Sequence, residues 1–236
     1  MLSRWQTELE GKAWNSLFWK NTQAPDEEGD ICFRPYEAIA YAIIAGGFYM
    51  GIIYEEKSRQ FHLYNDKISY IMTCLPNGQM GQLYYGKRIR HRESFGHLLE
   101  FAHRDMAPCV YEDDTTFSLE HIKQEYPGFG TGDMRYPAYG IRRENGSRVS
   151  CFVYKSHTIQ GGKPELPGLP AVYVEQDGEA QTLELYLEDP VAGMELVLLY
   201  TIYENMPVLT RSARFICRGP EPVCLERAMS LSLDLP

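Results

Sequence analysis

Three observations predict that this chain folds as an all-β domain whose antiparallel sheets pack face to face. Glycine or proline interrupts residues 125–175 every few positions, so no long helix can run through this central stretch. The short strand-like runs on either side are separated by turn residues and not by long helical patterns. Finally, Leu183, Leu185 and Leu187 alternate with more polar residues, which is the period-two pattern of a half-buried strand.

The first part of the β domain is expected to consist of hairpins. Four strand-like runs follow one another, at residues 51–55, 60–64, 68–74 and 82–85. Asn77-Gly78 is the strongest hairpin signal in the chain, because these residue types readily adopt positive φ angles. The pattern then becomes loop-like, with a short helix predicted within 94–103. Residues 117–125 fit either a helical turn or an edge strand.

Strand-like runs resume in the central stretch and continue to the end of the chain. They lie at residues 136–142, 149–156, 171–175, 182–188, 194–203, 207–216 and 223–235. Asn145-Gly146 falls between the first two of these runs and predicts a tight hairpin that joins them. Residues 194–203 are apolar on both faces, which favours a central position between layers.

Residues 1–49 differ in composition from the rest of the chain. All three tryptophans lie before residue 20, and this first part can form a helix. We therefore predict an extension over residues 1–49, followed by a β domain over residues 50–236. Two interpretations of the extension remain open: a translated, non-native leader that precedes a true start at Met50, and a native helix that covers a sheet edge.

Charge and hydropathy exclude several kinds of partner. The net charge of −9 argues against nucleic acid and anionic membranes, because phosphate binding requires a basic surface. The dense basic cluster at residues 87–92 (KRIRHR) is interpreted as a solvated loop after a strand. Residues 38–53 are apolar, but they are fewer than the ~20 that a membrane-spanning helix needs. No membrane span is predicted.

The cysteines and histidines suggest neither a metal site nor a disulfide framework. The six cysteines are scattered and include no Cys-x-x-Cys pair. Because no signal peptide is apparent either, we expect a cytoplasmic protein with reduced thiols. The six histidines show no His-x-x-x-His spacing, so no metal is predicted. His157 is expected to bond a backbone carbonyl within a strand rather than to activate its neighbour Ser156.

Two acidic residues in the central stretch, Glu125 and Asp133, form the one candidate catalytic pair. A glycosidase needs two carboxyl groups that flank the scissile bond. In the alternative interpretation, which we favour, Asp133 caps a turn and pairs with Arg135 or Arg142, while Glu125 ends a strand. We therefore predict no catalytic residue in this chain.

Six segments between about Met50 and the last residue match one known family in order. They are FHLYNDKISYI (61–71), GQLYYGKRI (81–89), FSLEHIKQEYPGFGTGDMRYPAY (117–139), YKSHTIQGGKPELPGLPAVYVE (154–175), TRSARF (210–215) and LERAMSLSLDLP (225–236). With these segments the chain resembles the N-terminal domain of bacterial α-galactosidases of glycoside hydrolase family 36. The resemblance covers one domain of a larger enzyme.

The resemblance implies a β-supersandwich, and it implies that both catalytic aspartates belong to a (β/α)₈ barrel that this chain lacks. The full enzyme is then expected to hydrolyse terminal α-linked galactose from melibiose- or raffinose-type sugars, with retention and without a cofactor. The domain would shield the barrel and build a homo-oligomer. Its partners would be its own catalytic barrel, other copies of the enzyme and, through the full enzyme, α-galactosides.

One loop carries a further expectation from the resemblance. In tetrameric family members the loop corresponding to residues 95–108 brings an acidic residue to a neighbouring subunit's sugar pocket. By this resemblance the equivalent position here is His103, and Asp105 lies two residues further on. These two residues are therefore candidates for the substrate rim. The alternative is a rim loop without sugar contact.

A second hypothesis for function is a free-standing galactoside-binding module. In it Tyr126, Tyr136 and Tyr139 would act as stacking platforms for the apolar faces of sugars. The tryptophans lie outside the β domain, which weakens this hypothesis.

Overall fold

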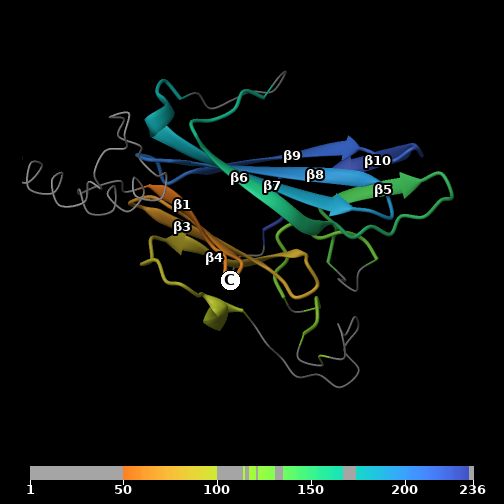
Figure 1. Cartoon of the computed structure of the whole chain (residues 1–236), viewed down its shortest axis with the longest axis horizontal. Coiled ribbons are helices and arrows are strands. Elements are labelled where there is room, and N and C mark those ends of the chain that lie inside the picture. Colours follow the sequence, from red (N-terminus) through yellow and green to blue (C-terminus); the bar gives the residue numbers. More distant parts are fainter. Residues whose placement is uncertain are drawn as a thin grey trace, which may run out of the picture. The chain divides into compact units, whose positions relative to one another are not determined.

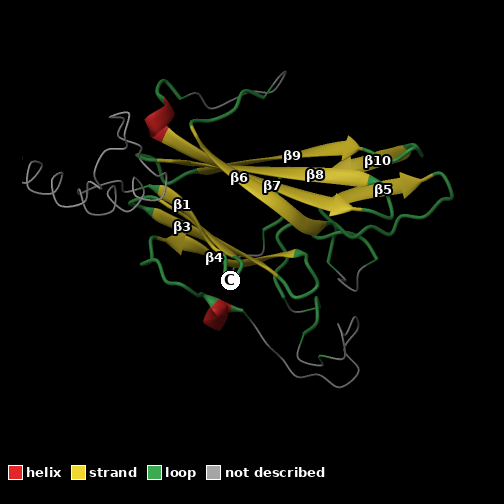
Figure 2. Cartoon of the chain, in the orientation of Figure 1, coloured by secondary structure: helices red, strands yellow, loops and turns green. Residues whose placement is uncertain are grey.

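The computed structural model describes residues 50–99, 114, 117–120, 122–130, 135–166 and 174–233 (Figure 1). Within these residues there are ten strands and two 3₁₀ helices of a single turn each. Figure 2 shows how strands dominate this part of the chain. The predicted extension, residues 1–49, lies outside the described residues, so the domain boundary at residue 50 stays a prediction.

The first sheet contains four antiparallel strands in the order β1-β2-β3-β4. They are β1 (Gly51–Glu55), β2 (Gln60–Tyr64), β3 (Ile68–Cys74) and β4 (Met80–Lys87). Gly78 has a φ of 83° in the turn between β3 and β4, as the Asn-Gly signal predicted. The first three strands have the predicted bounds, because alternation and turn residues specify such hairpins locally.

The second sheet is also antiparallel, in the order β6-β7-β8-β9. Its strands are β6 (Val153–Gly161), β7 (Ala180–Asp189), β8 (Met194–Tyr203) and β9 (Leu209–Cys217). Nine of the ten β8 residues are buried, which confirms its predicted central position. β6 begins later and extends further than the sequence predicted.

A third, two-stranded sheet pairs β5 (Tyr139–Arg143) with β10 (Val223–Ala228). The predicted hairpin at Asn145-Gly146 is therefore wrong, although its turn exists and Gly146 has a φ of 83°. Arg143 N of β5 still donates to Ser147 O (2.9 Å) at the turn, but the ladder does not continue, because the amides that follow find other acceptors. Ser150 N donates to Phe129 O (3.4 Å) and Cys151 N donates to Asp189 Oδ2 (2.9 Å).

Other differences concern the segments between and after the strands. Within 94–103 the described part holds only the 3₁₀ helix η1 (Gly96–Leu98), and the other 3₁₀ helix, η2 (Asp177–Glu179), precedes β7. The described part of 117–125 forms no helix and no named strand; it has one isolated bridge, between Gln124 and Gly81 of β4. β10 ends well before the predicted residue 235.

The core lies between the first and second sheets, which face each other in Figure 1. It includes Leu63 of β2, Met72 of β3, Leu185 of β7 and Leu198 of β8, all fully buried. A hydrogen bond from Ile52 N to Gln181 Oε1 (3.0 Å) also joins the two sheets. The structure thus confirms the predicted all-β fold of antiparallel sheets packed face to face.

We predict that Gly193→Ala in the turn between β7 and β8 destabilises the domain by about 2 kcal/mol. Gly193 has a φ of 65°, and a β-carbon there would lie 2.7 Å from the Gly219 Cα atom, which is backbone and cannot rotate away. Urea unfolding measures the loss. Gly178→Ala is the matched control, because a β-carbon at Gly178 meets no atom within 4 Å. Equal stability of the two variants would contradict this account.

Candidate functional site: a buried carboxylate between the sheets

The sequence candidate Glu125 occupies the centre of the only ion pair in the described residues whose side chains are both almost fully buried. Its backbone runs beside β4, where Glu125 N donates to Met80 O (2.8 Å) and Gln82 N donates to Lys123 O (2.8 Å). This backbone pairing holds the Glu125 side chain in the interior, where none of it is exposed.

Three donor groups converge on the Glu125 carboxyl. The Tyr70 hydroxyl of β3 lies 2.9 Å from Oε1 and 2.7 Å from Oε2, and the Tyr200 hydroxyl of β8 lies 2.7 Å from Oε1. Arg211 Nη1 of β9 lies 2.9 Å from Oε1, and 4% of the Arg211 side chain is exposed. Donors from both sheets therefore meet on one carboxyl group, which ties the sheets together.

Arg211 makes further contacts that fix its guanidinium. Nη1 and Nη2 each donate to the Glu125 carbonyl oxygen at 3.2 Å. The guanidinium also lies 5.0 Å from the ring centroids of both Tyr126 and Tyr200, within the range of cation–π attraction. The arginine is thus held by a carboxylate, a carbonyl and two aromatic faces.

Burial and charge act in opposite directions on this cluster. Burial raises the pKa of Glu125, and Arg211 with the Tyr200 and Tyr70 hydroxyls opposes that shift. Burial acts to lower the pKa of Arg211, but Tyr200 and Glu125 outweigh it, so that this pKa is raised. Arg211 therefore stays protonated. Three donor groups point at the two oxygens of Glu125, an arrangement that an ionised carboxylate satisfies.

This geometry makes Glu125 a structural residue and not a catalytic acid or base. A catalytic carboxyl must reach a substrate, whereas both oxygens of Glu125 are occupied inside the core. The favoured prediction that Glu125 ends a strand is wrong, because Glu125 lies outside the named strands. Asp133 lies outside the described residues, so its partner stays a prediction. Arg142, one partner proposed for it, pairs with Glu226 at 2.7 Å.

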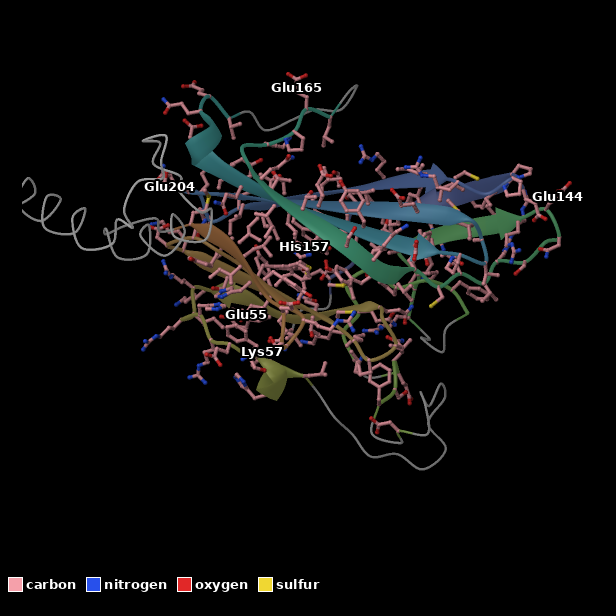
Figure 3. The ribbon with its side chains drawn as sticks, in the orientation of Figure 1. Glu55, Lys57, Glu144, His157, Glu165 and Glu204 are labelled. Carbon is pink, nitrogen blue, oxygen red and sulfur yellow. The ribbon has the colours of Figure 1, made fainter. Side chains whose placement is uncertain are left out.

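His157 of β6 lies between the two sheets, where Figure 3 labels it. Its ring is 4.4 Å from the Tyr54 ring centroid and 4.9 Å from that of Phe61. Its Nδ1 atom lies 2.7 Å from the Tyr154 hydroxyl, so the predicted bond to a backbone carbonyl is wrong. Tyr154 Oη reaches the ring because both side chains point into the same aromatic cluster. His157 serves packing.

Of the three tyrosines considered as sugar platforms, two are inaccessible. Tyr126 is 9% exposed and Tyr139 is 2% exposed, and their rings stack on each other at 5.5 Å. Tyr136 is 66% exposed, but the Arg227 guanidinium lies 4.4 Å from its ring centroid. The structure therefore leaves Tyr136 as the one exposed ring among these three positions, and Arg227 covers part of it.

The remaining site predictions stay open or find no support among the described residues. His103 and Asp105 lie outside the described part of the chain, so their role at a substrate rim stays a prediction. Where the chain is described, no group of three or more His, Cys, Asp or Glu side chains is placed to bind a metal ion. No helix of that part is long and apolar enough to cross a membrane.

These features define an all-β sandwich domain in which the one almost fully buried ion pair of the described residues stabilises the fold. The glycosyl hydrolase family 36 N-terminal domain model matches residues 78–236, and the chain belongs to this family. α-Galactosidase AgaA of Geobacillus stearothermophilus is 44% identical over 190 residues, which are 79% of this chain and 26% of AgaA. Mel36A of Lactobacillus acidophilus is 36% identical over 186 residues, 78% of this chain and 25% of that enzyme.

Solved structures agree with this assignment. The α-galactosidase of Lactobacillus brevis superposes with a TM-score of 0.75 at 37% identity, over 78% of this chain and 25% of that one. AgaB of Geobacillus stearothermophilus superposes with a TM-score of 0.70 at 44% identity, over 77% and 24%. The chain spans about a quarter of the length of the relatives it matches.

We predict that Glu125→Gln lowers the free energy of unfolding by about 3–5 kcal/mol, because it leaves the Arg211 charge buried without its counter-charge. Urea unfolding measures the loss. Glu226→Gln, which removes the exposed partner of Arg142, is the control and is expected to have a much smaller effect.

The double variant Glu125→Gln with Arg211→Met is expected to lose less stability than the sum of the two single variants. Additive losses, or a Glu125→Gln variant as stable as the parent chain, would contradict the structural role of the pair.

Proposed function

We propose that this domain serves an α-galactosidase that releases terminal α-linked galactose from melibiose- and raffinose-type sugars. The relatives AgaA and Mel36A are named α-galactosidases, and AgaA variants have been solved with raffinose and with stachyose. The observation that carries the proposal is the 44% identity with AgaA over 190 residues. Bond cleavage would take place with retention in a barrel outside these residues, without a cofactor.

The domain itself would act as an accessory to that barrel. The buried Glu125–Arg211 ion pair stabilises the fold, whereas several large apolar side chains are exposed. They are Phe129 (54%), Tyr136 (66%), Val149 (51%), Leu225 (41%) and Leu231 (44%). Two contacts bring some of these residues together. Val149 lies against Gly130, the neighbour of Phe129, since a β-carbon on Gly130 would contact it. Arg227 of β10, near Leu225, covers the Tyr136 ring. We propose that the barrel covers these side chains in the longer protein.

The proposal extends to assembly and location. The homo-oligomer is proposed from the family resemblance. A cytoplasmic location is consistent with the four described cysteines, Cys74, Cys151, Cys217 and Cys224, which are all free thiols. Within such an oligomer the loop that contains His103 and Asp105 would reach the substrate rim. A free-standing galactoside-binding module is the alternative, and the burial of Tyr126 and Tyr139 counts against it.

We predict that the purified 236-residue chain does not hydrolyse a nitrophenyl α-galactoside above the buffer rate. The physical reason is that the buried Glu125 is not available as one half of a carboxyl pair. AgaA assayed in parallel is the positive control. Turnover that co-purifies with the folded chain and disappears in Asp133→Asn would overturn the accessory role, whereas heat evolved on titration with raffinose would favour the binding module.

We also predict that the isolated chain self-associates, so that sedimentation gives a mass above 27.2 kDa. The exposed apolar side chains would otherwise remain in water. Phe129→Gln together with Leu231→Gln is expected to reduce association. The control is Val191→Gln in the β7–β8 turn, because Val191 is 73% exposed but lies apart from these residues in sequence. A strictly monomeric parent chain at high concentration would contradict the prediction.

A further inference from the structure

A hydrogen-bonded chain of four side chains crosses the outer face of the first sheet. Ser69 Oγ of β3 lies 2.9 Å from His62 Nε2 of β2, and His62 Nδ1 lies 3.1 Å from His91 Nδ1. His91 Nε2 lies 2.9 Å from Glu55 Oε1 of β1, which Figure 3 labels on this sheet. His62 alternates with Phe61 and Leu63, which point into the core, so His62 points to the opposite face.

The inner end of this hydrogen-bonded chain is buried because residues 88–95, here called the strap, pass over the outer face, whereas His91 and Glu55 at its other end are partly exposed. His62 is 2% exposed and Ser69 is fully buried. Two strap amides donate to side chains of the sheet: Ile89 N to Ser69 Oγ (3.0 Å) and Phe95 N to Gln60 Oε1 (2.7 Å). The ring of Phe95 packs edge-on against His62 at 5.3 Å. The strap is therefore fastened through the same residues that form the chain.

The hydrogen positions on the two histidine rings can be assigned by starting from Glu55, at one end of the hydrogen-bonded chain. A carboxylate only accepts, so His91 Nε2 carries a hydrogen that it donates to Glu55. In a neutral His91 the Nδ1 atom is then an acceptor, so His62 must carry its hydrogen on Nδ1. His62 Nε2 in turn accepts from the Ser69 hydroxyl, whose oxygen accepts from Ile89 N. With one proton between the two rings, every donor has an acceptor.

One added proton can be accommodated on His91 Nδ1, because His62 can then carry its own hydrogen on Nε2 and donate it to Ser69 Oγ. Protonation of both rings destroys the arrangement. Both Nδ1 atoms would then be donors facing each other at 3.1 Å. The surroundings add repulsion, since the Arg88 guanidinium lies 5.1 Å from the Tyr64 ring centroid beside the pair. Arg88 and Arg90 also line a pocket of about 390 Å³ that reaches His62 and His91, and Glu55 is the carboxylate bonded to the pair. That pocket gives solvent protons a path to the rings.

We propose that the His62–His91 pair is a pH-sensitive latch, which holds the strap on the first sheet while one hydrogen lies between the two Nδ1 atoms and releases the strap when both rings are protonated. The direction of the effect follows from His62. Burial first, and then the charges of His91 and Arg88, lower the pKa of His62 to about 4. A lowered pKa means that the latch contributes its stability above the ordinary histidine pKa of 6.5 and loses it as the pH falls towards 4.

Ring-nitrogen NMR of the whole chain tests the proton assignment without any substitution. At neutral pH, ¹⁵N shifts should show His62 protonated on Nδ1 and His91 protonated on Nε2. Two rings with the same tautomer, or a pair that is doubly protonated at neutral pH, would overturn the proposal.

Amide hydrogen exchange tests the release. Protection factors of the Ile89 and Phe95 amides, corrected for the intrinsic pH dependence of exchange, should fall by roughly 10- to 100-fold between pH 7 and pH 4.5. The Leu198 amide in β8 reports global unfolding and should keep its protection. The double variant His62→Gln with His91→Gln should lose the pH response of the strap, and the control His97→Gln should retain it. Strap protection that is independent of pH, or a response that survives in the double variant, would refute the latch.

Discussion

The constraint on which the rest of this domain depends is the burial of one negative and one positive charge between its sheets. A lone charge in such a core costs several kcal/mol, so Glu125 and Arg211 are tolerable only as a pair. Their partners come from β3, β8, β9 and the segment beside β4. Because a carboxylate and a guanidinium have directional bonding, the pair also fixes how the two sheets are aligned, which apolar packing alone specifies less sharply.

The buried position of Glu125 bears on which role this domain has in its family. In the central stretch the acid that looks most catalytic, Glu125, is consumed by the fold, and its neighbours Tyr126 and Tyr139 are buried beside it. Under the proposed function, the chemistry of a glycosidase would come from residues outside this buried centre. A domain with a rigid polar centre and apolar side chains on its surface is suited to supporting another domain.

The sequence predicted well those features that depend on local patterning. The bounds of β1, β2, β3 and β8 follow from alternation and turn residues, and the resemblance in six segments identified the family. Prediction from the sequence failed where pairing between residues distant in sequence determines the structure. β5 joins β10 rather than its neighbour along the chain, and the partners of Glu125 are 55 to 86 residues away. The basic cluster at residues 87–92 is largely the solvated loop that was predicted, with Arg88, Arg90 and Arg92 exposed, but nothing in it reveals that His91 meets His62.

The same separation in sequence has a kinetic consequence. Each four-stranded sheet joins strands that are consecutive along the described chain, with the order of the strands unchanged, so each can assemble from nearby contacts. The charge pair spans 86 residues and can close only when the two sheets meet. Until that moment Glu125 and Arg211 keep their hydration shells, and both shells must be shed in one event. Dehydration of the pair thus makes the meeting of the sheets a single cooperative step of folding.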